Sequence, residues 1–300
     1  MNRISSPSPV RLLIALLAVS LAASAADAQN PAPGQTLPAA SGQAAPPAQP
    51  AAKPSPENDW LARTSKLYYS SAKAGLTGFD CDVHPDWHTL FISANKGATV
   101  DEGDARLALL KTVKITMHAR MKGGSTIDWL AVSSPDMPID QHSTDMLEGM
   151  HQSVQQTLEG FLQFWSPFMD GSVVPDSAEG LEITHTATVH TIHAAQAGTE
   201  LTEIFDNNRV LEQFNVVMSG TSIKFSPSYT PTAQGLLVNR FVAQILPTGA
   251  APEHAQEMKV GIEYQTVDDL IIPGSLNMEV VGTGVFNFTF DGCTTNSKSN

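Results

Sequence analysis

The stretch Val113-Lys-Ile-Thr-Met-His-Ala-Arg-Met-Lys-Gly-Gly124 decides the fold class of this chain. Its odd positions are apolar as far as Met121, and its even positions are polar or charged up to the two glycines. That period of two is typical of a β-strand with one buried face. The glycines favour a tight turn, and residues 126–133 alternate again. The segment is therefore predicted to form a β-hairpin.

The same alternation continues through the second half of the chain and predicts a sheet of many antiparallel strands. Open sheets of this width usually curl. The expected fold class is therefore α+β, with a large curved antiparallel β-sheet that forms an unclosed half-barrel. The further strands are predicted in residues 183–192, 200–205, 210–218, 222–229, 236–246, 258–265, 276–281 and 286–290.

Two segments have a helical period instead. Apolar residues between positions 60 and 72 predict an N-terminal helix that ends at Gly75. Residues 144–169 carry a long apolar and aromatic stripe at spacings of three and four, with Ser143 or Thr144 to cap its start and Gly171 with Pro175 to end it. We expect this amphipathic helix to pack on the concave face of the sheet. Two interpretations remain open, because the stripe is either plain core or the lining of an apolar cavity.

The first 28 residues are typical of a cleavable secretory signal peptide. Arg3 and Arg11 precede an apolar run, residues 12–23. Small residues then lead to a predicted cleavage site after Ala28. The run is too short for a permanent span, which needs roughly 20 apolar residues. The mature chain is therefore expected in the periplasm or secreted, soluble and without a stable membrane span. No cysteine near the cleavage site offers a thiol for lipid anchoring.

Residues 29–57 consist almost wholly of Pro, Ala, Gln, Gly and Ser, so they cannot form a core and are predicted to be a disordered linker. Residues 58–300 are then expected to form a single β-rich domain. Loss of the signal peptide takes the net charge from −13 to −14, because it removes two arginines and one aspartate. An acidic chain whose richest basic stretch, residues 111–122, is interleaved with apolar residues is not expected to bind nucleic acid.

Two cysteines, Cys81 and Cys293, are the only thiols in the chain. In an oxidising compartment such a pair favours a disulfide, here between the first and last strands. The alternative, a catalytic Cys81 thiol beside His84, is disfavoured because no other cation lies nearby in the sequence.

The histidines do not predict a metal site. His84 and His88 would converge only on a helix, and Pro85 separates them, so a polar loop at the sheet edge is expected. A second group, His185, His190 and His193, is divided between opposite strand faces. No hydrolase, metalloprotease or nucleotide-binding signature occurs, and the acidic pairs 101–102 and 268–269 fall in predicted turns. The chain is therefore interpreted as a non-enzyme without a cofactor.

The strand start Thr77-Gly-Phe79, the helical insertion and the closing stretch Tyr264-Gln-Thr-Val-Asp-Asp-Leu-Ile-Ile-Pro-Gly-Ser-Leu276 together carry a family resemblance. Across residues 58–296 the chain is similar to the periplasmic lipoprotein-carrier family and its outer-membrane lipoprotein-sorting relatives. The resemblance implies an unclosed β-barrel covered by helices, with an apolar interior that holds acyl chains. The chain departs from that family by a longer helical insertion and two cysteines, and none of its residues matches the family's basic cargo-handling positions.

The sequence is compatible with two functions. The first is an exported protein that binds or carries an apolar ligand, a lipid or acyl group, in a cavity between curved sheet and helix. The alternative is a structural or interaction module of the cell envelope whose core is filled by its own side chains. The residues expected to line the cavity are Phe161, Phe164, Trp165, Phe168, Phe286, Phe288 and Phe290.

Overall fold

The computed structural model describes residues 55–94, 101, 103–121, 125–131, 141–169, 173–196 and 198–297. The predicted signal peptide, the predicted linker as far as residue 54 and the predicted turn at residues 123–124 lie outside these ranges. The helices are α2 (Pro56–Ser65), α3 (Trp87–Ala94), α4 (Ala105–Leu110) and α5 (Gln141–Met169), with one 3₁₀ turn at Pro252–His254. The strands are β1 (Leu76–Pro85), β2 (Lys114–Arg120), β3 (Thr126–Leu130), β4 (Glu182–His185), β5 (Val189–Gln196), β6 (Thr199–Asp206), β7 (Leu211–Met218), β8 (Thr221–Thr232), β9 (Gly235–Pro247), β10 (Gln256–Val267), β11 (Leu270–Val280) and β12 (Gly284–Ser297).

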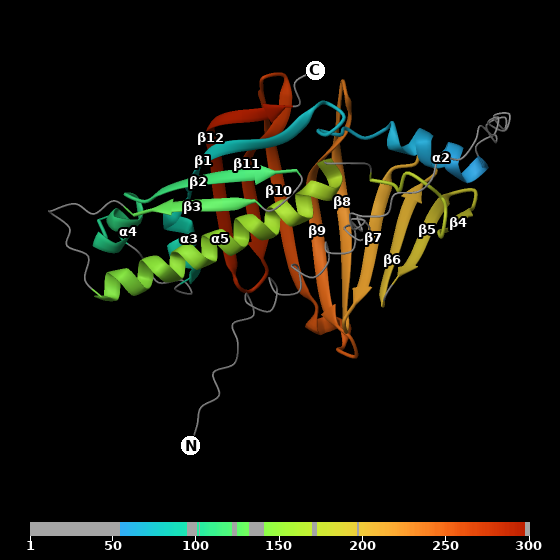
Figure 1. Cartoon of the computed structure of the whole chain (residues 1–300). Coiled ribbons are helices and arrows are strands. Elements are labelled where there is room, and N and C mark those ends of the chain that lie inside the picture. Colours follow the sequence, from blue (N-terminus) through green and yellow to red (C-terminus); the bar gives the residue numbers. More distant parts are fainter. Residues whose placement is uncertain are drawn as a thin grey trace, which may run out of the picture.

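All twelve strands belong to one antiparallel sheet, in the order β3-β2-β1-β12-β11-β10-β9-β8-β7-β6-β5-β4 (Figure 1). Strands β4 to β12 therefore form a continuous meander in which each strand pairs with the next. The three N-terminal strands join this meander through β1, which pairs with the last strand, β12. Strands β3 and β4 are the two edges, so the sheet is unclosed, as the sequence predicted.

The alternation that predicted the strands reflects burial of one face. On β2 the side chains of Ile115, Met117 and Ala119 are at most 2% exposed, while Thr116 and His118 face the other side. The same period places Phe286, Phe288 and Phe290 of β12 in the core. Burying one face of each strand supplies the main driving force for this sheet.

The N-terminal helix is shorter than predicted, because it ends at Ser65. The chain after it pairs with β9 instead of continuing the helix. Leu67 accepts a hydrogen bond from the amide of Leu236, whose carbonyl in turn accepts one from the amide of Tyr69. The helix also starts at Pro56, capped by Ser55, so the folded part begins inside the predicted linker.

Three local features were predicted incorrectly. The segment after Pro85 is not a polar loop, because α3 starts at Trp87. Helix α4 was missed. Residues 183–192 do not form one strand, since a turn between Thr186 and Val189 divides them into the hairpin of β4 and β5.

Helix α5 starts three residues earlier than predicted and crosses in front of the sheet in Figure 1. In its first half, His151 stacks on Trp129 of β3, with ring centroids 4.9 Å apart. At its end, the backbone amide and hydroxyl of Ser71 donate hydrogen bonds of 2.8 and 2.7 Å to the carbonyl oxygen of Met169. The first half of α5 and its C-terminal end are thus attached to the N-terminal part of the fold. In the described ranges, no helix has the length and apolar character needed to cross a membrane.

Gly235 is a position where a side chain is not tolerated. Its φ is +127°, and a Cβ there would lie 2.8 Å from the amide nitrogen of Tyr69 and 2.9 Å from the carbonyl oxygen of Leu67. Gly235→Ala should therefore lower the free energy of unfolding by about 3 kcal/mol, measured by urea denaturation. Gly282→Ala is the matched control, since Gly282 also has a positive φ but a Cβ added there would have no described atom within 4 Å. Equal losses in both variants would contradict the steric argument.

Candidate functional site

Five phenylalanines join α5 to the middle of the sheet, and we call this group the aromatic seam. Phe164 lies 5.0 Å from Phe225 of β8, and Phe168 lies 5.9 Å from Phe214 of β7, measured between ring centroids. Both α5 rings also contact Phe241 of β9, at 6.0 and 6.5 Å. The rings of Phe214 and Phe225 stack on each other at 4.3 Å. The seam therefore provides an uncharged, polarisable surface between helix and sheet.

A second contact fixes α5 by a hydrogen bond. The indole N–H of Trp165, which is fully buried, donates to the hydroxyl of Tyr264 on β10 at 3.1 Å. That hydroxyl donates in turn to the carbonyl oxygen of Val238 on β9. Burial raises the pKa of Tyr264 well above its usual value, so the phenol stays neutral. Trp165 also meets Phe79 of β1 edge-on at 5.9 Å and stacks on Phe161 at 6.1 Å.

Tyr264→Phe should lower the free energy of unfolding by about 1–3 kcal/mol, because it leaves the buried Trp165 N–H without its acceptor. Tyr229→Phe is the matched control. The Tyr229 hydroxyl is buried and has no hydrogen-bond partner within the described residues, so its removal should not destabilise the fold. Urea denaturation of both variants measures the difference, and a larger loss in Tyr229→Phe would overturn this interpretation.

The predicted lining residues divide into two groups. Those of α5 lie together with rings of β1 and β7–β9. Phe286, Phe288 and Phe290 are buried on the core face of β12, but they make no ring contact with the α5 aromatics within the described part of the chain. Their part in lining a cavity stays a prediction.

One carboxyl group is buried beside the aromatic seam. Glu203 of β6 pairs in register with Phe214 of β7 on one side and with Ile192 of β5 on the other. Directly opposed residues point to the same face of a sheet, so Glu203 faces the core. It is 8% exposed, and its Oε2 atom has no hydrogen-bond partner among the described residues. Burial raises the pKa of Glu203 to about 8, which favours the protonated acid at neutral pH.

Two tyrosines lie near this carboxyl. The rings of Tyr68 and Tyr229 meet edge-on at 5.4 Å. The Tyr68 hydroxyl donates to the carbonyl oxygen of Arg209 and accepts from the amide of Leu211. Burial raises the pKa of both phenols, so both stay protonated at neutral pH. These residues therefore form a neutral polar cluster inside the core.

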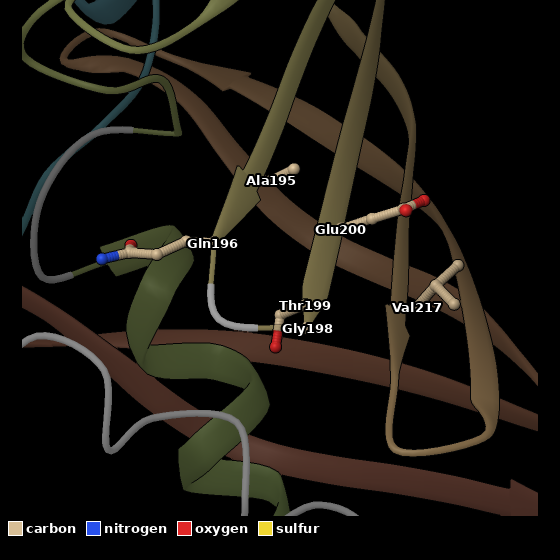
Figure 2. A pocket seen from close by; sticks show the side chains of 6 residues that line it. All are labelled: Ala195, Gln196, Gly198, Thr199, Glu200 and Val217. Atoms are coloured by element: carbon tan, nitrogen blue, oxygen red, sulfur yellow. The ribbon is translucent and has the colours of Figure 1, made fainter.

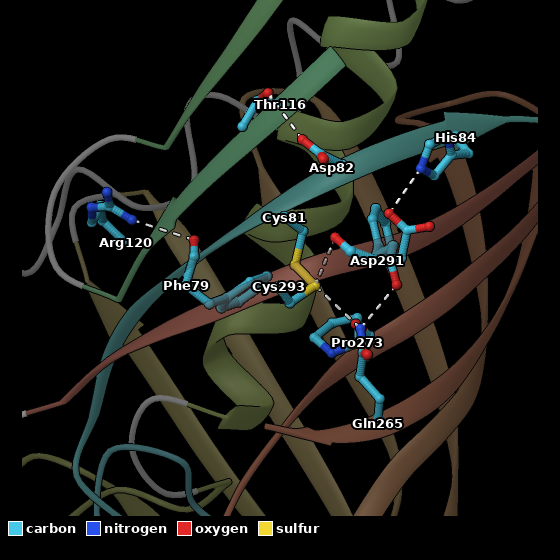
Figure 3. Close-up of a disulfide and its surroundings, with 11 residues drawn as sticks. Phe79, Cys81, Asp82, His84, Thr116, Arg120, Gln265, Pro273, Asp291 and Cys293 are labelled. Atoms are coloured by element: carbon cyan, nitrogen blue, oxygen red, sulfur yellow. Dashed lines mark hydrogen bonds and ion pairs between the residues drawn. A yellow bond between two sulfur atoms is a disulfide. The ribbon is translucent and has the colours of Figure 1, made fainter. Parts of the chain in front are cut away.

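The disulfide partners meet on the neighbouring strands β1 and β12, the third and fourth strands from the β3 edge of the sheet (Figure 3). The sulfur atoms of Cys81 on β1 and Cys293 on β12 lie 2.07 Å apart, at disulfide distance, as the sequence predicted. The side-chain amide of Gln265 on β10 donates to the carbonyl oxygens of Pro273 and Phe290 and lies 3.3 Å from the Cys293 sulfur. The pair is thus surrounded by structural hydrogen bonds rather than by groups that would activate a thiol.

The opposite face of the same strands carries a polar network. Asp80 accepts hydrogen bonds from Arg120 at 2.8 Å and from Asn296 at 3.1 Å, and it lies 2.6 Å from the His118 ring. Burial opposes ionisation of Asp80, but these hydrogen bonds lower its pKa, while the bond to Asp80 raises the pKa of His118. The network ties β1 to β2 and β12.

The histidines considered in the sequence as metal ligands have other partners. His84 lies 2.9 Å from Asp291, and the Nδ1 atoms of His185 and His190 lie 2.9 Å apart across the β4–β5 hairpin. His193 contacts Thr202 instead. In the described ranges, no group of three or more His, Cys, Asp or Glu residues is arranged to hold a metal ion.

Figure 2 shows a surface pocket of about 290 Å³ at the ends of β5, β6 and β7. A second pocket of about 560 Å³ lies between the start of α2 and residues 177–183. The residues that line the pocket in Figure 2 are exposed and belong mainly to the β5–β6 hairpin end, Glu200 among them. Neither pocket adjoins the aromatic seam. The first is lined by Ala195, Gln196, Gly198, Thr199, Glu200 and Val217.

The sequence predicts the helix half of the seam but neither its sheet half nor Glu203. A signal for Glu203 was present, because it shares the strand parity of Phe205, which is fully buried. Comparison of the chain with protein-family models, with curated proteins and with solved structures found no match.

Proposed function

We propose that this chain is an exported protein that binds and carries an apolar ligand, a lipid or acyl chain, between α5 and the concave face of the curved sheet. The observation that carries the proposal is the aromatic seam. Its rings offer a surface onto which an acyl chain can pack by burial alone, since no charged group belongs to it. The predicted signal peptide and the resemblance to lipoprotein carriers support the same function.

The geometry of α5 supports a site that opens along the seam. Neighbouring strands rotate by roughly 20–25° relative to each other, so a sheet of twelve strands coils and gains a concave side. Phe164 is half-buried, whereas Phe161 and Trp165 are fully buried. A ligand that enters beside Phe164 would therefore meet the phenylalanines of β8 and β9 before the anchored Trp165.

A second candidate is a structural module with a filled core. The stacking of Phe214 on Phe225 at 4.3 Å and the complete burial of Phe161 favour it, because these side chains fill the space themselves.

One experiment distinguishes the two functions. The purified chain is titrated with the apolar fluorophore N-phenyl-1-naphthylamine, and native mass spectrometry records any lipid that co-purifies. A carrier should bind the probe saturably, and Phe164→Glu should weaken binding at least tenfold, because a carboxylate would enter the seam. Leu130→Glu is the control, since Leu130 of β3 is 62% exposed and lies outside the seam. No saturable binding and no lipid would refute the carrier and leave the filled module.

A further inference from the structure

We propose that Glu203 and Tyr229 form a polar subsite at the end of the aromatic seam that receives the carbonyl oxygen of an acyl ester. This inference rests on the proposed function and specifies its ligand class, an uncharged ester of a long acyl chain. The subsite donates two hydrogen bonds, one from the acid form of Glu203 and one from the Tyr229 hydroxyl.

The strand register places the Glu203 carboxyl beside the sheet side of the seam. Glu203 and Phe214 oppose each other in the β6–β7 ladder, so their side chains leave the sheet together. The Phe214 ring lies 5.9 Å from Phe168 of α5 and is stacked on Phe225. An acyl chain lying along the seam therefore ends beside Glu203.

Two buried polar atoms of this cluster have unused hydrogen-bonding capacity. Glu203 Oε2 and the Tyr229 hydroxyl are both buried and have no partner within the described part of the chain. A buried polar atom without a partner is costly, and such positions are typical of functional sites. Tyr68 is not free in this way, because its hydroxyl is used by Arg209 and Leu211, so it positions the Tyr229 ring instead.

The surroundings of Glu203 favour a ligand without charge at this position. Glu203 forms no ion pair within the described ranges, and its apolar ladder neighbours, Ile192 and Phe214, disfavour an ionised carboxylate. A free fatty acid, which is anionic at neutral pH, would bring a second carboxyl group to this place without a cation to balance it. A neutral carbonyl oxygen has two lone pairs and accepts from both donors.

The test uses three ligands that displace N-phenyl-1-naphthylamine at pH 7: methyl dodecanoate, pentadecane and dodecanoate. From the unaltered chain, the ester should displace the probe at least tenfold better than the alkane, and better than the carboxylate. In Glu203→Leu the ester-to-alkane ratio should fall close to one, while affinity for the alkane stays the same. Tyr229→Phe should reduce the ratio about fivefold.

Two further variants separate the subsite from a general effect. Glu203→Gln keeps an N–H donor and should keep most of the preference, and Glu200→Gln, exposed on the same strand, should change nothing. An unchanged ester-to-alkane ratio in Glu203→Leu would overturn the subsite and leave the carrier standing. Failure of both ester and alkane to displace the probe, or absence of probe binding, would instead refute the proposed function, and the subsite with it.

Discussion

Replacing both Cys81 and Cys293 with alanine should lower the free energy of unfolding by about 5 kcal/mol in the chain-entropy model of disulfides. The two residues are separated by 212 positions, so the cross-link removes a very long loop from the unfolded ensemble. The bond also lies where the three N-terminal strands join the meander, between β1 and β12. Urea denaturation of the double variant and of the oxidised parent measures the loss.

The reduced parent protein is the control for this prediction, because it lacks the bond but keeps both side chains. It should unfold close to the double variant. A free-thiol assay on denatured, unreduced protein establishes the starting state, in which no thiol should react. Equal midpoints for the oxidised parent and the double variant would show that the cross-link contributes nothing.

Glu203→Gln should stabilise the fold, and the gain should grow with pH. Burial raises the pKa of Glu203 from its ordinary value of 4.5 to about 8, so between these values the folded chain keeps a proton that the unfolded chain has lost. Stability from this group is therefore fully present below pH 4.5 and falls by about 1.4 kcal/mol per pH unit as the pH rises towards 8. Above pH 8 the loss levels off. Glutamine does not titrate, so the variant should lack this slope and gain several kcal/mol at pH 8.

Urea denaturation of both proteins at a series of pH values from about 5 to about 9 measures this difference. Glu200→Gln on the same strand is the control, because its side chain is exposed and should not alter the pH profile. Parallel profiles for the parent and Glu203→Gln would mean that the carboxyl is ionised in the folded state.

The period of two predicted most of the sheet, because a strand with one buried face needs an apolar residue at every second position, as at Ile115 and Met117. Short helices leave no such trace. Helix α4 has six residues, and α3 has eight, too few for a helical period to stand out. Asp86 could have indicated the start of α3, because it accepts hydrogen bonds from the amide and the hydroxyl of Thr89. Pro85 directed the prediction to a loop instead.

The candidate site was predicted only in part for a related reason. The aromatic stripe of α5 is periodic within one segment, so Phe164 and Phe168 were found. Their partners on β7, β8 and β9 follow from strand order and register, which a single sequence does not state. Glu203 was missed because a carboxyl group is expected on the solvent face of a strand.

The pairing of β1 with β12 has a consequence for how the chain reaches its fold. Strands β4 to β12 can pair one after another as hairpins of low contact order. Strand β1, in contrast, requires a partner that is synthesised about two hundred residues later. The first three strands to be synthesised are therefore the last to be joined to the rest of the sheet. Until then β1 and β2 expose an apolar face and an unpaired edge, which is the condition under which nascent chains aggregate or recruit chaperones.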